Sequence, residues 1–235
     1  MNDALEAARR RERARIRAEY ARRARELPAA RYHLSDPGHR FLQRSQERAM
    51  AAALSGHGAE LSDRQRLLEI GCGGGRWLRF FANRGAPVSQ LIGLDLDLGR
   101  LHAAPGGSPR LAADASCLPF ASGCFDRVLQ STVMSSILDA AVRQAVAAEM
   151  LRVLRPGGAL LWYDLRLDNP RNKQVKGIRR RTLRSLFPGC TIAVRRTTLA
   201  PPLARLLARR ARPLATLLDA SRLLASHELA VIRPR

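Results

Sequence analysis

A glycine cluster flanked by two carboxylates carries the clearest chemical pattern in this chain. The apolar run 67–70 contains Glu69 and leads into glycines at 71–75, and a second apolar run, 91–94, is followed by Asp95. Glycines directly after a buried strand allow a tight turn into a helix, where the backbone can approach a ligand closely. An acid at the tip of the next strand can accept hydrogen bonds from ribose hydroxyls, each worth about 1.5–3 kcal/mol. The pattern therefore predicts a site for a ribose-containing cofactor.

The spacing of the glycines narrows the choice of cofactor. Gly71 and Gly73 would begin a Gly-x-Gly-x-x-Gly dinucleotide motif, but Arg76 occupies the position of its third glycine. The chain also lacks the Gly-Lys-Ser or Gly-Lys-Thr of a triphosphate-binding loop. Residues 69–75, Glu-Ile-Gly-Cys-Gly-Gly-Gly, instead resemble the first motif of the class I S-adenosylmethionine-dependent methyltransferases.

Three further segments follow in the order that this family requires. Residues 111–115 resemble the loop after the third strand, 125–131 the fourth strand, and 149–161 the helix, turn and fifth strand that come next. The resemblance covers residues 67 to about 165. It implies an α/β fold: a doubly wound, Rossmann-like sheet of seven strands, mostly parallel with one antiparallel strand, to which N-terminal helices are added.

The same resemblance implies S-adenosyl-L-methionine as the cofactor and assigns residues to its methionine end. Gly71, Gly73 and Gly75 would form the turn. Glu69 would orient the methionine end, through its ammonium group or through the glycine loop. The backbone carbonyl of Gln130 would lie near the same ammonium group.

Other residues are assigned to the nucleoside end of the cofactor. Asp95 would hold both ribose hydroxyls, and Leu96 would lie against the adenine. Asp114 would accept a hydrogen bond from the adenine amino group, with the backbone of Ala115 nearby. Asp97 remains an alternative to Asp95 if the second strand ends later than expected.

The implied reaction is attack of a substrate nucleophile on the cofactor's methyl group, in which orientation alone can lower the barrier by about 7–11 kcal/mol. A base is needed only for a nucleophile that arrives protonated. Asp164, at the end of the fifth expected strand, is a candidate base or substrate anchor facing the cleft; alternatively it pairs with Arg166 or caps a turn. His33 is the histidine candidate for a base, with a solvated loop residue as the alternative.

Apolar runs alternate with helical segments through the middle of the chain, which predicts parallel strands with ligands at their carboxyl ends. A sixth and a seventh strand are expected to pair antiparallel at one edge. The seven expected strands lie near 67–71, 91–95, 110–113, 125–131, 158–165, 190–198 and 228–232.

The residues before the core predict two helices, over 2–27 and 38–55. The second half of the first carries an apolar stripe, whereas Glu12 and Arg13 interrupt it and predict solvated first turns. The helix either packs or self-associates, or caps the cofactor cleft; in the second case Tyr20 or Tyr32 would reach the cofactor's amino-acid end. The stripe consists of Ile16, Tyr20, Ala24 and Leu27.

Length and pattern predict a single domain, 1–235. It divides into an N-terminal helical cap (1–60), a cofactor-binding core (61–165) and C-terminal strands (166–235) with a helical insertion at 199–227. The leucine-rich insertion is expected to pack over the sheet edge with some role as a substrate lid, a membrane-facing patch being the alternative.

Composition limits the partners. A net charge of +21 permits nucleic acid, but 39 arginines against two lysines reflect a GC-rich genome, and few tyrosines and tryptophans are available for base stacking. The four cysteines form no Cys-x-x-Cys pair, so neither metal nor disulfide is predicted. Neither a signal segment nor a transmembrane segment is expected, which favours a cytoplasmic protein; a homodimer remains open.

These observations favour a methyltransferase that acts on a small molecule or biosynthetic intermediate, such as a natural product, a glycan precursor or a lipid precursor. An RNA methyltransferase is the alternative that the charge favours. A non-catalytic scaffold that keeps the cofactor fold is a third hypothesis.

Overall fold

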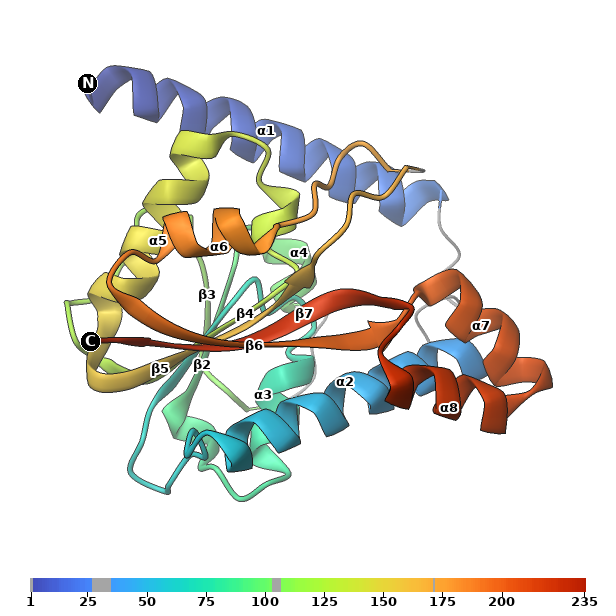
Figure 1. Cartoon of the computed structure of the whole chain (residues 1–235). Helices are drawn as coiled ribbons and strands as arrows, with labels where there is room; N and C mark the ends of the chain where they lie inside the picture. The colour runs from blue at the N-terminus through green and yellow to red at the C-terminus, as the bar shows by residue number, and fades with distance from the viewer. Residues whose placement is uncertain (1, 27–34, 103–106, 171) are drawn as a thin grey trace.

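A computed structural model describes residues 2–26, 35–102, 107–170 and 172–235. Its centre is one seven-stranded sheet with the order β3-β2-β1-β4-β5-β7-β6, in which β7 alone runs antiparallel to its neighbours (Figure 1). This confirms the predicted fold class. The strands are β1 (Leu67–Ile70), β2 (Leu91–Asp95), β3 (Arg110–Ala112), β4 (Phe125–Ser131), β5 (Leu154–Leu165), β6 (Cys190–Leu199) and β7 (Ala225–Pro234).

Helices cover both faces of the sheet, as Figure 1 shows. On one face α1 (Asn2–Glu26), α5 (Ala140–Val153) and α6 (Arg180–Leu186) pack together and bury one apolar cluster against the strands. On the other, α2 (Pro37–Gly56), α3 (Arg76–Ala82) and α4 (Leu98–His102) contribute to a second cluster. Short 3-10 turns η2 (Val88–Gln90) and η3 (Met134–Ser136) lie before β2 and after β4. The sheet is therefore buried from both sides, which explains its continuous apolar strands.

The starts of two helices follow from local sequence. The Asp36 carboxylate accepts a 2.7 Å hydrogen bond from the His39 amide, and Pro37 fills the first turn of α2. Asp139 caps α5 in the same manner through the amides of Ala141 and Val142. No helix in the described ranges combines the length and apolar character that crossing a bilayer requires.

The N-terminal helix packs through its first half as well as through part of the predicted stripe, in which Ile16 contacts the apolar cluster and Tyr20 is half-buried. Ala8 and Glu12 in its first half are buried, whereas Ala24 in its second half is exposed. The expectation of solvated first turns was wrong because the Glu12 carboxylate is hydrogen-bonded within the protein. It accepts from Arg15 of α1 and from the amide of Leu138 on the loop after β4.

The predicted insertion is helical and forms a hairpin of α7 (Pro201–Arg210) and α8 (Arg212–Ser221), joined through Ala211. It packs on α2 through small residues, among them the fully buried Ala204 and Ala215, which join an apolar cluster containing Phe41 of α2. Both helices also contact the edge strand β6, which agrees with packing over the sheet edge, and the expected role as a substrate lid stays a prediction.

The contact between α2 and α7 depends on a glycine, and this gives a test of the packing. A Cβ on Gly38 would lie 2.7 Å from the Cα of Arg205, so backbone would have to move. We expect Gly38→Ala to lower the free energy of unfolding by about 1–3 kcal/mol, measured by urea denaturation. Gly56→Ala is the matched control on the same helix, since a Cβ there meets no atom within 4 Å, and it should be neutral or slightly stabilising. Equal effects of the two substitutions would contradict the close approach.

Candidate functional site

A cavity opens where α1 crosses the carboxyl ends of β1, β2, β3 and β4. The cavity has a volume of about 120 Å³ and is open to solvent at its mouth. The predicted site residues that line it are Tyr20, Gly71, Asp95, Leu96, Asp114 and Ala115. Segments that are far apart in the sequence thus meet at the edge where the resemblance places the cofactor.

The glycine turn reaches the floor of this cavity at Gly71. Gly71 adopts a φ of 69°, and a Cβ there would lie 2.4 Å from Cγ2 of Val133, a neighbouring wall residue. Gly73 also has a positive φ, of 46°. The positive φ angle favours glycine at both positions. At Gly71 a side chain would also collide with Val133.

Asp95 joins the glycine turn to the tip of β2. Its Oδ2 accepts from the amide of Gly73 at 2.7 Å, and its Oδ1 accepts from the amide of Asp97 at 3.0 Å. A carboxylate offers about four acceptor positions, so two remain for two further donors. Asp97 is instead used to start α4, because its Oδ1 accepts from the amide of Gly99 at 2.9 Å. The alternative assignment of the ribose to Asp97 is therefore disfavoured by the geometry.

Asp114 lines the cavity from the loop after β3, next to β2: the amide of the preceding residue, Ala113, donates to the carbonyl of Asp95 at 3.1 Å. The Oδ1 of Asp114 accepts from both the amide (2.8 Å) and the hydroxyl (2.7 Å) of Ser116, and its Oδ2 accepts from Arg13 at 3.1 Å. These three bonds leave one of about four acceptor positions on the carboxylate unused. One position suits one N–H of an adenine amino group. Leu96 and Ala115 supply apolar wall beside it.

Arg100 and Tyr20 close the ribose side. The Arg100 guanidinium lies 3.7 Å from Oδ2 of Asp95 and stacks over the Tyr20 ring at 4.6 Å. It also covers the glycine turn, since a Cβ on Gly73 would lie 2.3 Å from its Nη2. Tyr20 therefore lines the cavity next to Arg100, and its contact with the cofactor's amino-acid end stays a prediction.

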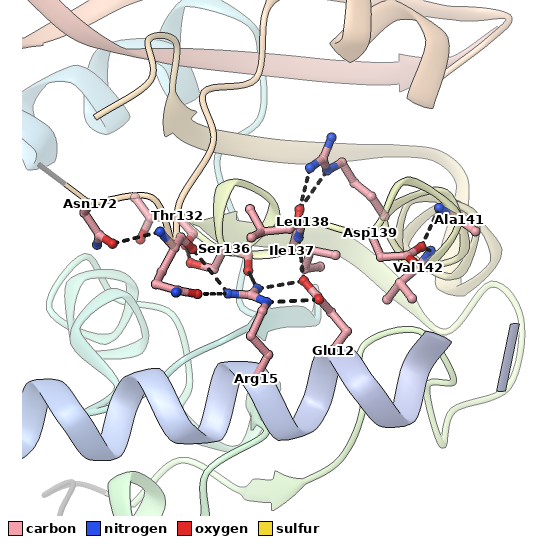
Figure 2. Close-up of polar contacts among 12 residues, drawn as sticks. Glu12, Arg15, Thr132, Ser136, Ile137, Leu138, Asp139, Ala141, Val142 and Asn172 are labelled. Carbon is pink, nitrogen blue, oxygen red and sulfur yellow. Dashed lines mark hydrogen bonds and ion pairs between the residues drawn. The ribbon is translucent and has the colours of Figure 1, made fainter. Parts of the chain in front are cut away.

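A polar cluster fixes α1 to the loop after β4, as Figure 2 shows. Glu12 accepts from the amide of Leu138 and pairs with Arg15 at 2.7 Å. Arg15 in turn donates to the carbonyl of Ser136 and, at 2.8 Å, to the side-chain oxygen of Gln174. Burial acts to raise the pKa of Glu12, but the bonds from Arg15 and Leu138 outweigh it and hold that pKa below its ordinary value.

Four predicted residues do not line the cavity. Glu69 is buried and accepts from the amide of Leu78 at 3.2 Å, so it holds the start of α3; burial raises its pKa to about 8. Gln130 accepts from the amide of Val133 at 3.1 Å and so shapes the loop after β4. Gly73 and Gly75 belong to the turn but do not line the cavity.

The position of Asp164 differs from the expected one. It was expected to face the cleft, but it is buried and absent from the cavity wall, and its Oδ2 accepts from the amide of Ser135 at 3.1 Å. Its Oδ1 accepts from the amide of Leu165 at 2.8 Å. Burial raises the pKa of Asp164 to about 6. These contacts agree with the alternative prediction, in which Asp164 caps a turn.

Two predicted residues, Tyr32 and His33, lie outside the described residues. In the described part of the chain, no cluster of histidine, cysteine and acidic residues could hold a metal, and the cysteines are free thiols. Burial raises the pKa of the Cys72 thiol beside the glycine turn to about 12, which makes it unreactive.

Several residues that line the cavity, chiefly from α1, were not predicted from the sequence. The sequence around Arg9, Glu12 and Arg13 is typical of a charged, solvated helix face. Nothing in the local sequence connects Arg13 with Asp114, 101 positions away. Thr132 also lines the cavity and holds a φ of 58°, an uncommon conformation for threonine that is often found at functional sites. Local sequence gives no sign of that backbone conformation.

Comparison with known proteins identifies the central part of the chain. Residues 68–162 match the family model described as a methyltransferase domain. That segment is a methyltransferase domain. A relative named uncharacterized methyltransferase, from Mycobacterium sp. (strain JLS), is 34% identical over 155 residues, covering 63% of this chain and 59% of its own.

Other relatives of this methyltransferase domain agree. A demethylmenaquinone methyltransferase of Mycolicibacterium vanbaalenii is 32% identical over 136 residues, which cover 57% of this chain and 56% of that protein. The crystal structure of an S-adenosylmethionine-dependent methyltransferase from Mesorhizobium loti shares the fold, with a TM-score of 0.55, 21% identity and coverage of 77% and 97% of the two chains. The chain spans about three fifths of the length of the curated relatives that it matches, 59% for the first.

The anchoring of α1 by Glu12 gives a second test. Glu12→Gln removes the ion pair with Arg15 and weakens the acceptor for Leu138, so we expect faster amide exchange in α1 and residues 132–138, and a loss of about 1–3 kcal/mol of stability. Glu19→Gln is the matched control, because within the described residues the ion pairs of Glu19 are with Arg22 and Arg23 of its own helix, and it should change stability by less than about 0.5 kcal/mol. Unchanged exchange at 132–138 in the Glu12 variant would contradict the anchoring role.

Proposed function

We propose that the protein is an S-adenosyl-L-methionine-dependent methyltransferase whose acceptor is a small molecule or biosynthetic intermediate. The observation that carries the cofactor assignment is the unused hydrogen-bond acceptor capacity of two carboxylates that line one cavity: two positions on Asp95, whose Oδ2 also lies 3.7 Å from Arg100, and one on Asp114. Two ribose hydroxyls and one adenine amino group match that capacity.

The residues present fit this cofactor. Asp95 would hold the ribose, Leu96 and Ala115 would contact the adenine, and Asp114 would accept from its amino group. Gly71 lines the cavity, so the methionine moiety would lie against the backbone of the turn, and the carbonyl of Gln130 remains the proposed partner of its ammonium group. When bound, the cofactor supplies a methyl group on a sulfonium, an electrophile that needs no further activation.

For catalysis we propose positioning rather than a base within the described site. Asp164 acts as a positioning residue: by holding the amide of Ser135 it orders η3, next to the wall residues Val133 and Ser136. His33 remains the candidate base for an acceptor that arrives protonated. Orientation of the acceptor against the methyl group would supply the main part of the rate enhancement.

The small-molecule acceptor class draws support from the relatives and from the site. One relative is named for demethylmenaquinone, a small acceptor. The cavity lies beneath α1, and that helix contributes Arg9, Glu12, Arg13, Ile16 and Tyr20 to its wall, so the site is partly enclosed. RNA as the acceptor remains the alternative that the net charge of +21 favours.

Paired substitutions of the two neighbouring acids test the proposal. Asp95→Asn should weaken S-adenosylmethionine binding, measured by titration calorimetry, by at least about tenfold, since one charged acceptor of about 1.5–3 kcal/mol is lost. Asp97→Asn, two residues away, keeps the cavity wall and should bind within about threefold of the unchanged protein.

The acceptor class is tested by methyl transfer from labelled cofactor into host extract, with and without ribonuclease. Label in a ribonuclease-resistant small-molecule or lipid fraction, lost in the Asp95 variant, is the expected result. Label that disappears with ribonuclease would replace the small-molecule acceptor by RNA, and absence of cofactor binding would leave only the scaffold hypothesis.

A further inference from the structure

The α7–α8 hairpin, residues 200–224, exposes much more apolar surface than the rest of the molecule. In the remainder of the described chain, the exposed large apolar side chains are Val88, Leu98 and Leu167. The hairpin alone has six, with exposed fractions between 36% and 79%. Concentration of exposed leucines in one short segment marks an interaction surface. They are Leu203, Leu206, Leu214, Leu217, Leu223 and Leu224.

Helix geometry directs these leucines away from the core. The buried alanines Ala204, Ala208 and Ala215 form the inner side of the hairpin and join the apolar cluster shared with α2. Leu203 and Leu206 of α7 are three residues apart, as are Leu214 and Leu217 of α8, so each pair lies on one side of its helix. Figure 1 shows the hairpin at the outer edge of the molecule, beyond α2. The surface is therefore open to a partner.

The hairpin is also strongly basic. Residues 200–224 contain five arginines and one acid, Asp219. That acid is turned inward, where its Oδ1 accepts from the hydroxyl of Ser45 at 2.8 Å and the amide of Leu199 at 2.9 Å. The arginines consequently make the outer surface of the hairpin positively charged.

A groove beside the hairpin collects more arginines. It runs between α2 and the junction of α7 and α8, and its guanidinium groups come from Arg40, Arg44, Arg48, Arg209 and Arg212. Arg209 pairs with Asp36 and Arg48 pairs with Asp219. No ion pair involves the other three within the described part of the chain. A groove of this kind suits phosphate groups, which arginine binds through paired donors.

We propose that the α7–α8 hairpin docks the protein on an anionic lipid bilayer. The leucines enter the boundary between headgroups and acyl chains, and the arginines of the groove bind lipid phosphates. Leucine on one side and arginine on another is the composition of helices that lie in a membrane interface. Single-stranded RNA would need stacking residues, and residues 200–224 contain no aromatic side chain. A second copy of the chain would bring the same arginines against one another.

Docking of this kind goes beyond the proposed methyl transfer and does not depend on it. An acceptor with an apolar tail would reach a membrane-docked protein without passing through water. Cofactor affinity measured on the same samples keeps the two proposals separate, because the cavity and the hairpin share no lining residues.

Co-sedimentation with vesicles tests the docking. The full chain should bind vesicles of 70% phosphatidylcholine and 30% phosphatidylglycerol, and bind pure phosphatidylcholine vesicles about tenfold more weakly. Leu217→Ser with Leu223→Ser should weaken binding about tenfold, whereas the control pair Val88→Ser with Leu167→Ser, also exposed, should leave it unchanged. Thermal melting checks that every variant is folded.

Charge substitutions complete the design. Arg44→Gln with Arg212→Gln should lower affinity about tenfold at low salt and flatten its salt dependence. Arg64→Gln with Arg181→Gln removes two exposed arginines elsewhere and should have a smaller effect. Three results would overturn the proposal: a folded protein that does not sediment with the anionic vesicles, hairpin and control variants that bind equally, or leucine variants that only convert a dimer to a monomer. Binding of an RNA oligonucleotide that depends on the groove arginines, without vesicle binding, would assign the surface to nucleic acid.

Discussion

The link between Asp95 and the glycine turn is the constraint on which the rest of the site depends. A carboxylate at the tip of β2 reaches across to the amide of Gly73 and fixes the turn that follows β1. This works only because the turn can hold a left-handed conformation with no side chain to fill it. The same carboxylate keeps half its acceptor capacity for a ligand. One residue therefore shapes the floor of the cavity and offers its main polar contact.

The wall opposite that floor is held by polar contacts rather than by a continuous apolar stripe. Glu12 and Arg15 tie α1 to the loop after β4, and Arg13 reaches Asp114 at the end of β3. Hydrogen bonds that include a charged group are worth about 1.5–3 kcal/mol each, so a few of them can dock a helix. The helix and Asp114 are consequently coupled: a ligand that engages Asp114 would touch the same carboxylate that holds α1.

The sequence predicted the parts of this protein that follow from local pattern. Apolar runs and the glycine cluster identified the strands, the sheet class and the polar residues at the strand tips, such as Asp95 and Asp114. What it missed depends on pairings across the chain. Glu12 looked solvated because its partner, the Leu138 amide, is a backbone group 126 residues away. Asp164 looked like a cleft residue because its position at a strand end is visible in sequence, whereas the direction of its side chain is not.

The most direct test of the central claim is amide hydrogen exchange with and without S-adenosyl-L-methionine. If the cavity beneath α1 is the cofactor site, the ligand should protect the glycine turn (71–75), the tip of β2 (95–97), the loop after β3 (113–116) and α1 together, because all four meet in one cavity. Absence of protection would contradict the assignment. So would protection confined to segments outside the cavity, or protection of the turn that leaves α1 exchanging as before.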